Sequence, residues 1–273
     1  MITERAKYVL TLTENESGKL RPPVTSQAIY PMLMCLDNDE LIDLYLAHFD
    51  SRLETRLVGV LIKRMESSPK GTFDGFLLRI VQLMGDVDYS RYRKLRAHLR
   101  QFLLFGSEAL KSSCFDFFIH SERNTDRQVA CEAAQYIWSK AIESRLWECW
   151  YQTSDKGVIQ VLIQHADPIR LAEVFPAVWN SDSISWRVQR QLAERLAEDH
   201  LDLVRVTCSD SPLTYIHLAA KNGRLASDDE MRACRPLQRD EDDFGFWLYL
   251  LGLTRKWILL VSVIAENEGD GVK

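Results

Sequence analysis

Basic side chains crowd into one short stretch of the chain, residues 89–102 (YSRYRKLRAHLRQF). Helical periodicity places Arg93, Arg96 and Arg100 on one face of such a helix, apart from its apolar stripe. Several guanidinium groups on one face could bind phosphates or an acidic protein surface. Charged helix faces are more often solvated or packed beside acidic neighbours, so this alternative stays open.

Tryptophans are the second group of residues with a capacity for binding. Five of the seven lie between Trp138 and Trp186. The helical i, i+3 spacing of Trp147 and Trp150 favours packing between helices, although exposed tryptophans also anchor protein partners and stack on bases. The candidate partner-binding tryptophans are Trp147, Trp150, Trp186, Trp247 and Trp257.

Motifs typical of catalysis or metal binding do not occur in the sequence. The six histidines are scattered singly, and there is no HExxH, P-loop, GxSxG or GxGxxG pattern. An acidic block at residues 239–243 (RDEDD) lacks the ligand spacing of a calcium loop. Solvation and helix capping explain it more simply, although it could dock a basic partner. We therefore expect no catalytic residue, no bound metal and no cofactor.

Charge and cysteine content restrict the setting in which the chain works. The formal net charge of −5 opposes general attraction to nucleic acid and to anionic membranes. Six cysteines without a CxxC pair, behind a start that lacks an apolar signal stretch, predict reduced thiols and a cytoplasmic location. The apolar stretch 244–265 carries Arg255 and Lys256 at its centre, and each charge would cost about 3 kcal/mol in a bilayer. No membrane association is expected.

Helices are the elements that must position these residues. Apolar residues in the segment 54–66 recur at i, i+1, i+4, i+5 and i+8, on one stripe of a 3.6-residue helix. The same template returns at 129–137 and 158–166, and related segments start roughly 30 to 38 residues apart, as in two-helix repeats. No comparable alternating pattern predicts a substantial sheet, so we expect an all-α fold.

Helix starts are marked by residues that can accept hydrogen bonds from free backbone N–H groups. Three of them have capping-box spacing, and two precede a proline at the first helical position. These starts are at Ser51, Thr125, Ser227, Asp167 and Ser211.

Residues 125–141 (TDRQVACEAAQYIWSKA) resemble the second helix of a HEAT repeat. An Asp near the helix start, a Val, a pair of small Ala residues and a late large apolar residue carry the resemblance. These are Asp126, Val129, Ala133, Ala134 and Ile137. The resemblance covers residues 39–222 with degenerate copies, and it implies a right-handed stack of antiparallel helix pairs, a HEAT-like α-solenoid. Such proteins mostly serve as binding scaffolds.

A second resemblance concerns residues 185–193 (SWRVQRQLA), which are similar to the Trp-plus-basic helix start of HEAT-like DNA glycosylases. It implies an enzyme that uses tryptophans and an aspartate on the concave face of a solenoid. The residue order beside Trp186 differs, however, and no catalytic aspartate can be assigned. The acidic net charge also opposes the attraction to phosphates that such an enzyme needs.

Three regions are expected along the chain: an irregular polar arm at 1–36, HEAT-like repeats at 37–224, and an acidic loop with an apolar C-terminal helix at 225–273. A terminal solenoid helix usually has a polar outer face, but this one is apolar nearly all round. It should therefore fold onto the core, pair with a second copy in a homodimer, or meet a partner. Its main stripe is Phe246, Leu250, Leu253, Trp257, Leu260 and Ile264.

Two functions from different classes follow as expectations. The first is a non-enzymatic protein-binding scaffold or adaptor, in a narrower form an immunity or antitoxin-type protein that masks a basic effector. The alternative is a HEAT-like nucleic-acid-binding protein or DNA glycosylase that uses residues 91–100 and a tryptophan-rich face. The lack of a catalytic motif favours the first. Convergence of the arginines and tryptophans in one groove would favour the second.

Overall fold

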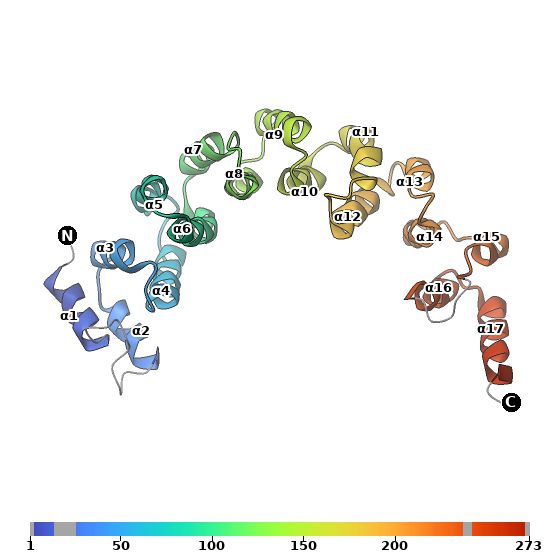
Figure 1. The fold of residues 1–273 in the computed structure, drawn as a ribbon, viewed down its shortest axis with the longest axis horizontal. Coiled ribbons are helices and arrows are strands. Elements are labelled where there is room, and N and C mark those ends of the chain that lie inside the picture. Colours follow the sequence, from blue (N-terminus) through green and yellow to red (C-terminus); the bar gives the residue numbers. More distant parts are fainter. Residues whose placement is uncertain (1–2, 14–25, 237–241, 271–273) are drawn as a thin grey trace. The chain divides into compact units, whose positions relative to one another are not determined.

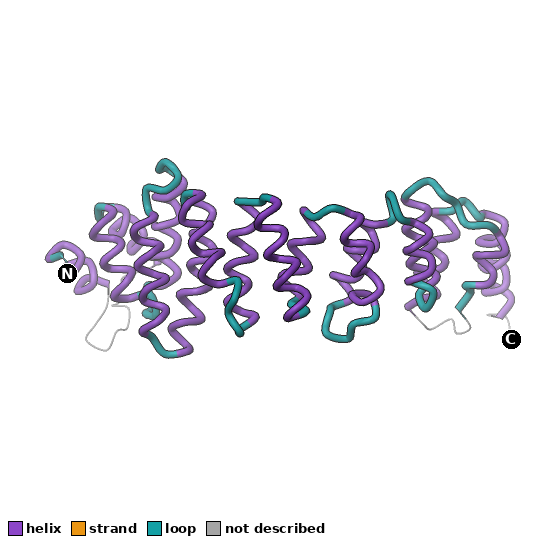
Figure 2. Tube along the Cα trace, turned by 90° about the horizontal axis from the view of Figure 1, so that it is seen from above, coloured by secondary structure: helices purple, strands orange, loops and turns teal. Residues whose placement is uncertain are grey.

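The computed structural model describes residues 3–13, 26–236 and 242–270, which form seventeen α-helices, one 3-10 helix and no strand (Figures 1 and 2). The predicted all-α fold is confirmed. Two compact units divide the chain, Met1–Val158 and Ile159–Lys273, and the division falls inside α10 (Lys156–His165). None of the helices in the described ranges has the length and hydropathy needed to cross a membrane.

The first unit consists of helices that pack in consecutive pairs. They are α1 (Glu4–Thr13), α2 (Ser26–Met34), α3 (Asn38–His48), α4 (Glu54–Glu66), α5 (Asp74–Asp86), α6 (Tyr89–Phe102), the 3-10 helix η1 (Leu103–Phe105), α7 (Glu108–Phe118), α8 (Asn124–Tyr136) and α9 (Lys140–Thr153). Helix α3 packs on α4, α5 on α6, and α7 on α8, while α2, α4, α6 and α8 contact one another in turn. In Figure 1, α3, α5 and α7 follow one side of this unit and α4, α6 and α8 the other.

The second unit continues with helices that also pack on their neighbours in sequence. They are α11 (Pro168–Trp179), α12 (Trp186–Leu196), α13 (Leu201–Thr207), α14 (Pro212–Lys221), α15 (Asp228–Ala233), α16 (Asp242–Leu253) and α17 (Trp257–Asp270). Helix α11 packs on α12, and α13 contacts α11, α12 and α14. Helix α14 then contacts α16, and α16 contacts α17.

The apolar stripe predicted for residues 54–66 contributes to the core of the first unit. Helix α4 has these same bounds, and Leu57, Leu61 and Met65 are buried on it. The stripe is buried because each of these residues lies one turn beyond the last and so faces the same neighbours. Deleting any one side chain would leave a cavity and cost about 2 to 5 kcal/mol.

A buried imidazole lies beside this core. The hydroxyl of Tyr45 donates to Nδ1 of His98 over 2.8 Å, and Nε2 of His98 lies 3.1 Å from Oε1 of Glu54. Both contacts are satisfied when the neutral ring carries its proton on Nε2 and donates it to the carboxylate. The rings of Phe76 and Phe102 pack around Tyr45, with centroids 5.3 and 5.9 Å away.

The capping predictions agree with the structure in part. Ser227 and Glu230 form the expected capping box, and Asp167 caps α11 by accepting a hydrogen bond from the N–H of Ile169. Ser211 stands at the N-cap of α14 but its side chain makes no cap hydrogen bond. The boxes expected at Ser51 and Thr125 are wrong, because α4 begins after Leu53 and α8 after Arg123. A turn separates Ser51 from the start of α4, whereas α8 begins one residue before Thr125.

The segment expected to be an irregular N-terminal arm contains helices in its described part. Helix α1 buries Ala6 and Val9, and α2 buries Ile29 and Leu33, which are one turn apart. The sequence signal is weak because α2 contains Pro31, which usually ends a helix. The expected domain boundaries at residues 36 and 224 remain predictions.

The single apolar C-terminal helix expected from the sequence is interrupted. Helix α16 ends at Leu253, and Arg255 adopts a left-handed conformation with φ of 60°. The N–H of Lys256 donates to the carbonyl of Leu251 and that of Arg255 to the carbonyl of Gly252, over 2.8 and 3.1 Å. These two bonds form a Schellman motif, which usually has glycine in the left-handed position. With arginine there, the break leaves no glycine signal in the sequence.

Candidate functional site

The three candidate arginines of α6 do not form a free cationic face. Arg100 pairs with Glu132 of α8 over 3.1 Å, whereas Arg93 is exposed. Arg96 is half-buried, and its Nη1 atom is buried without a hydrogen-bond partner among the described atoms.

Neighbouring basic residues of α6 are also paired within the first unit. Arg91 contacts Asp50 over 2.9 Å, and Lys94 contacts Glu54 of α4 over 2.7 Å. Much of the positive charge of this helix is therefore neutralised by acidic neighbours, as the alternative interpretation of the sequence anticipates.

The tryptophans of α9 belong to the interior. Trp147 and Trp150 are buried, and Nε1 of Trp147 donates to Oε1 of Glu143 over 3.1 Å. Their burial favours the packing interpretation over an exposed binding surface.

The remaining three candidate tryptophans lie in the second unit in different environments. Trp247 of α16 is buried and donates from Nε1 to the carbonyl of Met231 over 2.8 Å. Trp186 of α12 is 49% exposed and packs edge-on against Trp179, with ring centroids 5.1 Å apart. Trp257 begins α17 and is 57% exposed.

Helix α17 presents large apolar side chains to solvent. Ile258 is 85% exposed, and Val261 and Ile264 are also exposed, together with Trp257. Positions 257, 261 and 264 follow the i, i+4, i+7 spacing of one helical face. Val263 is buried, so the helix packs through another face. We call Trp257, Ile258, Val261 and Ile264 the α17 apolar face.

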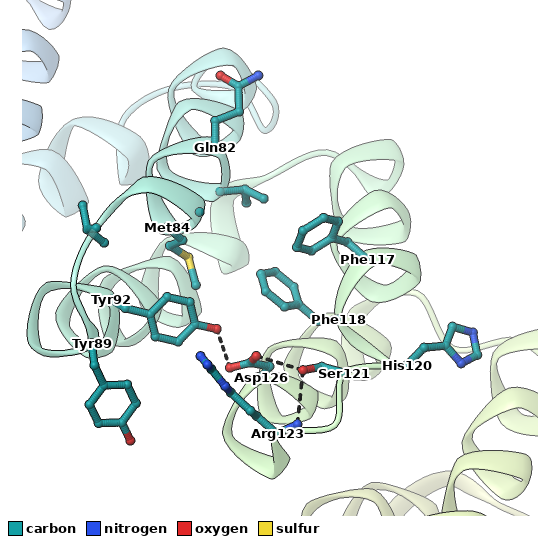
Figure 3. A pocket seen from close by; sticks show the side chains of 13 residues that line it. Gln82, Met84, Tyr89, Tyr92, Phe117, Phe118, His120, Ser121, Arg123 and Asp126 are labelled. Carbon is teal, nitrogen blue, oxygen red and sulfur yellow. Dashed lines mark hydrogen bonds between the residues drawn. The ribbon is translucent and has the colours of Figure 1, made fainter.

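A cavity of about 760 Å³ lies in the first unit, between α5, α6, α7 and α8 (Figure 3). In Figure 3, Met84 of α5 and Tyr92 of α6 face Phe117 and Phe118 of α7 across it. Phe117 is 68% exposed and packs edge-on against Phe118, with centroids 4.9 Å apart. This volume is in the range of small-molecule sites, and we call it the aromatic cavity.

A hydrogen-bonded carboxylate closes one side of the aromatic cavity. The hydroxyl of Tyr92 donates to Oδ1 of Asp126, and that of Ser121 donates to Oδ2 over 2.9 Å. Burial is the main cause that raises the pKa of Tyr92 above its ordinary value of 10.0, and the hydrogen bond to Asp126 raises it further. Tyr92 therefore stays protonated and keeps donating at neutral pH.

Two guanidinium groups act on this hydroxyl. The side chain of Arg123 lies over the ring of Tyr92, 5.8 Å from its centroid, and is exposed. Arg96 follows Tyr92 by one turn of α6, and the positive charges of both arginines lower the pKa of Tyr92 against the larger opposite effects.

The loop that carries Ser121 and Arg123 is held by a buried ion pair. Nη2 of Arg127 lies 2.7 Å from Oδ2 of Asp155, and Nη1 of Arg127 donates to the carbonyl oxygens of Ser121 and Glu122 over 2.7 and 3.0 Å. Asp155 also accepts from the N–H of Gly157 over 2.7 Å. Consecutive residues of α8, Asp126 and Arg127, thus anchor the same loop through opposite charges.

Sequence patterns did not identify the aromatic cavity. Phe117 is in an apolar helical stripe with Leu110, Cys114 and Phe118, yet it points to solvent. Two adjacent large residues on one helix, such as Phe117 and Phe118, cannot both face the same core contact. Their adjacency is the sequence feature that indicates an exposed ring. Arg123 belongs to no recognisable motif, because its position over Tyr92 depends on a loop that returns to α6.

Potential metal ligands form no metal site in the described part of the chain, and four of its thiols are buried and poorly reactive. No group of three or more His, Cys, Asp or Glu residues there could hold a metal ion. Cys114, Cys131, Cys149 and Cys208 are buried, and burial raises the pKa of Cys114 to about 11 and that of Cys208 to about 12. These thiols stay protonated at neutral pH and are poor nucleophiles.

The fold defines an all-helical protein whose helices pack on their neighbours in sequence. No protein-family model matches the chain, and neither a curated protein nor a solved structure matches it.

Proposed function

We propose that this chain is a non-enzymatic scaffold that binds another protein through the α17 apolar face. The carrying observation is the exposure of Trp257, Ile258, Val261 and Ile264 along one helix. Clusters of large apolar side chains on a surface are typical of protein interfaces, in which Trp is a frequent anchor. A partner with its own apolar groove or helix would remove these side chains from water.

For the architecture, we propose a HEAT-like solenoid of right-handed, antiparallel helix pairs. The successive contacts of α2, α4, α6 and α8 support it, because the second helices of neighbouring repeats stack in such folds. The small residues Ala133 and Ala134 of α8 are buried, as close helix approach requires.

A protein partner fits the charges of the chain better than nucleic acid does. Arg91, Lys94 and Arg100 of α6 are engaged with carboxylates of the same unit, and Trp147 and Trp150 are buried. Asp126, beside the aromatic cavity, has both carboxylate oxygens engaged in hydrogen bonds. A glycosylase would need free arginines for phosphates and a carboxylate free to act on a base.

In a narrower form of the proposal, the partner is basic, as expected for an immunity or antitoxin-type protein. The net charge of −5 supports this form, as do the exposed carboxylates of Asp229, Asp242 and Asp243 in the second unit. Electrostatic attraction of this kind would speed association and weaken with salt.

Site-specific photocrosslinking in cells of the source organism tests the proposal. A photoreactive amino acid at Ile258 should give one dominant heterologous adduct, and Ile258→Glu with Val261→Glu should abolish capture of the same protein. The matched control is position 206, because Val206 of α13 is also exposed and apolar, at 73%. We expect no adduct there and full capture by Val206→Glu.

Three results would count against the proposal. The first is an adduct from position 258 that contains only a second copy of this chain, which would indicate a homodimer. The second is equal capture by all variants. The third is binding to duplex DNA that weakens steeply with salt and is lost when Arg93, Arg96 and Arg100 are neutralised.

A further inference from the structure

We propose that the aromatic cavity of the first unit binds an aromatic or bulky aliphatic group that carries a single carboxylate. This inference goes beyond the proposed function, because the cavity and the α17 apolar face are built from different helices. Ligand binding in the aromatic cavity can therefore be tested independently of whether α17 binds a protein.

The apolar part of the ligand is matched by the walls of the cavity. Val81 and Met84 of α5 line the cavity together with Phe117 and Phe118 of α7, and Tyr89 contributes a further exposed ring. The exposed ring of Phe117 would be covered by an apolar group placed in the cavity. Burial of such a group stabilises a complex in proportion to the apolar area removed from water.

The anionic part of the ligand is matched by Arg123. Its guanidinium lies over the Tyr92 ring at the edge of the cavity, and no described carboxylate forms an ion pair with it. In Figure 3 its side chain extends toward Tyr92 and Asp126. A guanidinium held in this way can donate two parallel hydrogen bonds to a carboxylate.

Arg96 adds a second positive charge near the Tyr92 hydroxyl. It follows Tyr92 by one turn of α6, and its buried Nη1 atom has no hydrogen-bond partner among the described atoms. Arg96 does not line the aromatic cavity, so it would act on a bound anion through its charge, as it does on the Tyr92 hydroxyl.

The charge of the ligand follows from the balance of these groups. Arg96 and Arg123 contribute two positive charges near the Tyr92 hydroxyl, and Asp126 contributes one negative charge. Both oxygens of Asp126 are already engaged by Tyr92 and Ser121, so this carboxylate stays in place. The remaining single positive charge suits a carboxylate better than a doubly charged phosphate.

Such a carboxylate could come from a free small acid or from the C-terminal residue of a polypeptide. Isothermal titration of the full-length chain at pH 7.5 and low salt distinguishes these sources. The small probes are N-acetyl-L-phenylalanine and its neutral amide. The peptide probes are acetyl-Gly-Ser-Gly-Phe with a free and with an amidated C-terminus. Inorganic phosphate is the third kind of probe.

We expect the small acid to bind roughly two- to fivefold more tightly than its amide, the range for one ion pair with an exposed guanidinium such as that of Arg123. Arg123→Gln should bring this ratio close to one without changing the affinity of the amide, and Arg96→Gln should lower it. Phe117→Ala should weaken both probes alike. The matched control is Arg187→Gln, because Arg187 is an exposed arginine of the second unit; the ratio should not change.

Equal binding of acid and amide, no saturable binding of either, or an unchanged ratio in Arg123→Gln would overturn the proposal. Tighter binding of phosphate than of the acid would also overturn it. Binding of the free-ended peptide at least as tight as that of the small acid would assign the site to a polypeptide C-terminus, and weaker binding to a free small acid. Circular dichroism melting of each variant identifies any loss of fold, and Arg96→Gln replaces Arg123→Gln if the latter is unfolded.

Discussion

The hydroxyl of Tyr92 donates a hydrogen bond to the carboxylate of Asp126, and so connects the second helices of two neighbouring pairs, α6 and α8. Both side chains are buried. The connection therefore supports the packing of the first unit as well as one side of the aromatic cavity.

Replacing Tyr92 with Phe should destabilise the first unit. The change keeps the ring but removes the donor to Asp126, and a buried charged acceptor that loses a partner costs about 1 to 3 kcal/mol. Urea titration followed by circular dichroism measures the loss. Tyr89→Phe is the control, because the Tyr89 side chain is exposed and its change should have almost no effect. Equal stability of the two variants would contradict the role given to the hydrogen bond.

The Arg127 and Asp155 pair allows a sharper test, because each side chain is more than nine-tenths buried. Asp155→Ala leaves the guanidinium unpaired and should cost about 3 to 5 kcal/mol. Adding Arg127→Met removes the second charge and should recover part of this loss. A double-mutant cycle by urea titration measures the coupling. Additive effects of the two substitutions would show that the pair contributes nothing beyond its separate contacts.

Arg255→Gly should stabilise the second unit by about 0.5 to 1 kcal/mol. A non-glycine residue in the left-handed region costs about 1 to 2 kcal/mol, which the substitution removes. Part of this gain is lost because glycine has greater conformational freedom in the unfolded chain. Lys256→Gly is the control at the next position. It should destabilise the unit, since Lys256 pairs with Asp228 over 2.8 Å. Thermal melting compares the two variants, and a lower melting temperature for Arg255→Gly would contradict the prediction.

The folded chain should lose stability as the pH drops below about 6.5, the ordinary pKa of a histidine side chain. Burial is the main cause that lowers the pKa of His98 and of His217 in the folded chain. The unfolded chain therefore binds more protons than the folded chain between the folded pKa of each histidine and 6.5, and stability rises with pH over that window.

Urea titration at pH 7.5 and 5.5 measures this effect. The wild-type chain should be less stable at pH 5.5, and the double variant His98→Gln, His217→Gln should show a smaller difference between the two pH values. Folding lowers the pKa of some carboxyl groups, such as those of Asp43 and Glu230. Their contribution to stability is lost only at a pH below about 5.5, so it does not affect the comparison. An unchanged difference in the double variant would contradict the assignment.

Periodicity predicted the parts of the fold in which local pattern and packing agree. The segments 54–66 and 89–102 became α4 and α6 with those bounds, because each has one apolar stripe and packs on neighbours close in sequence. The break at Arg255 could not be read from the sequence, since a left-handed arginine is stabilised by the hydrogen bonds around it and not by its own preference.

The candidate site was less predictable than the fold for a related reason. Spacing placed Arg93, Arg96 and Arg100 on one helix face, but it could not show that Arg100 would meet Glu132, which is distant in sequence. The same holds for the aromatic cavity, where Arg123 of one loop returns to Tyr92 of α6. Contacts between helix pairs depend on the register of one pair on the next, which a local pattern does not contain.

The rate at which its buried thiol is alkylated reports how often each unit opens. Cys131 lies in the interior of the first unit and Cys208 in that of the second, whereas Cys35 is exposed. An alkylating reagent should therefore modify Cys35 at once and reach Cys131 or Cys208 only when the surrounding helices separate. Peptide mapping of the modified chain over time would then show whether the two units open together or one at a time.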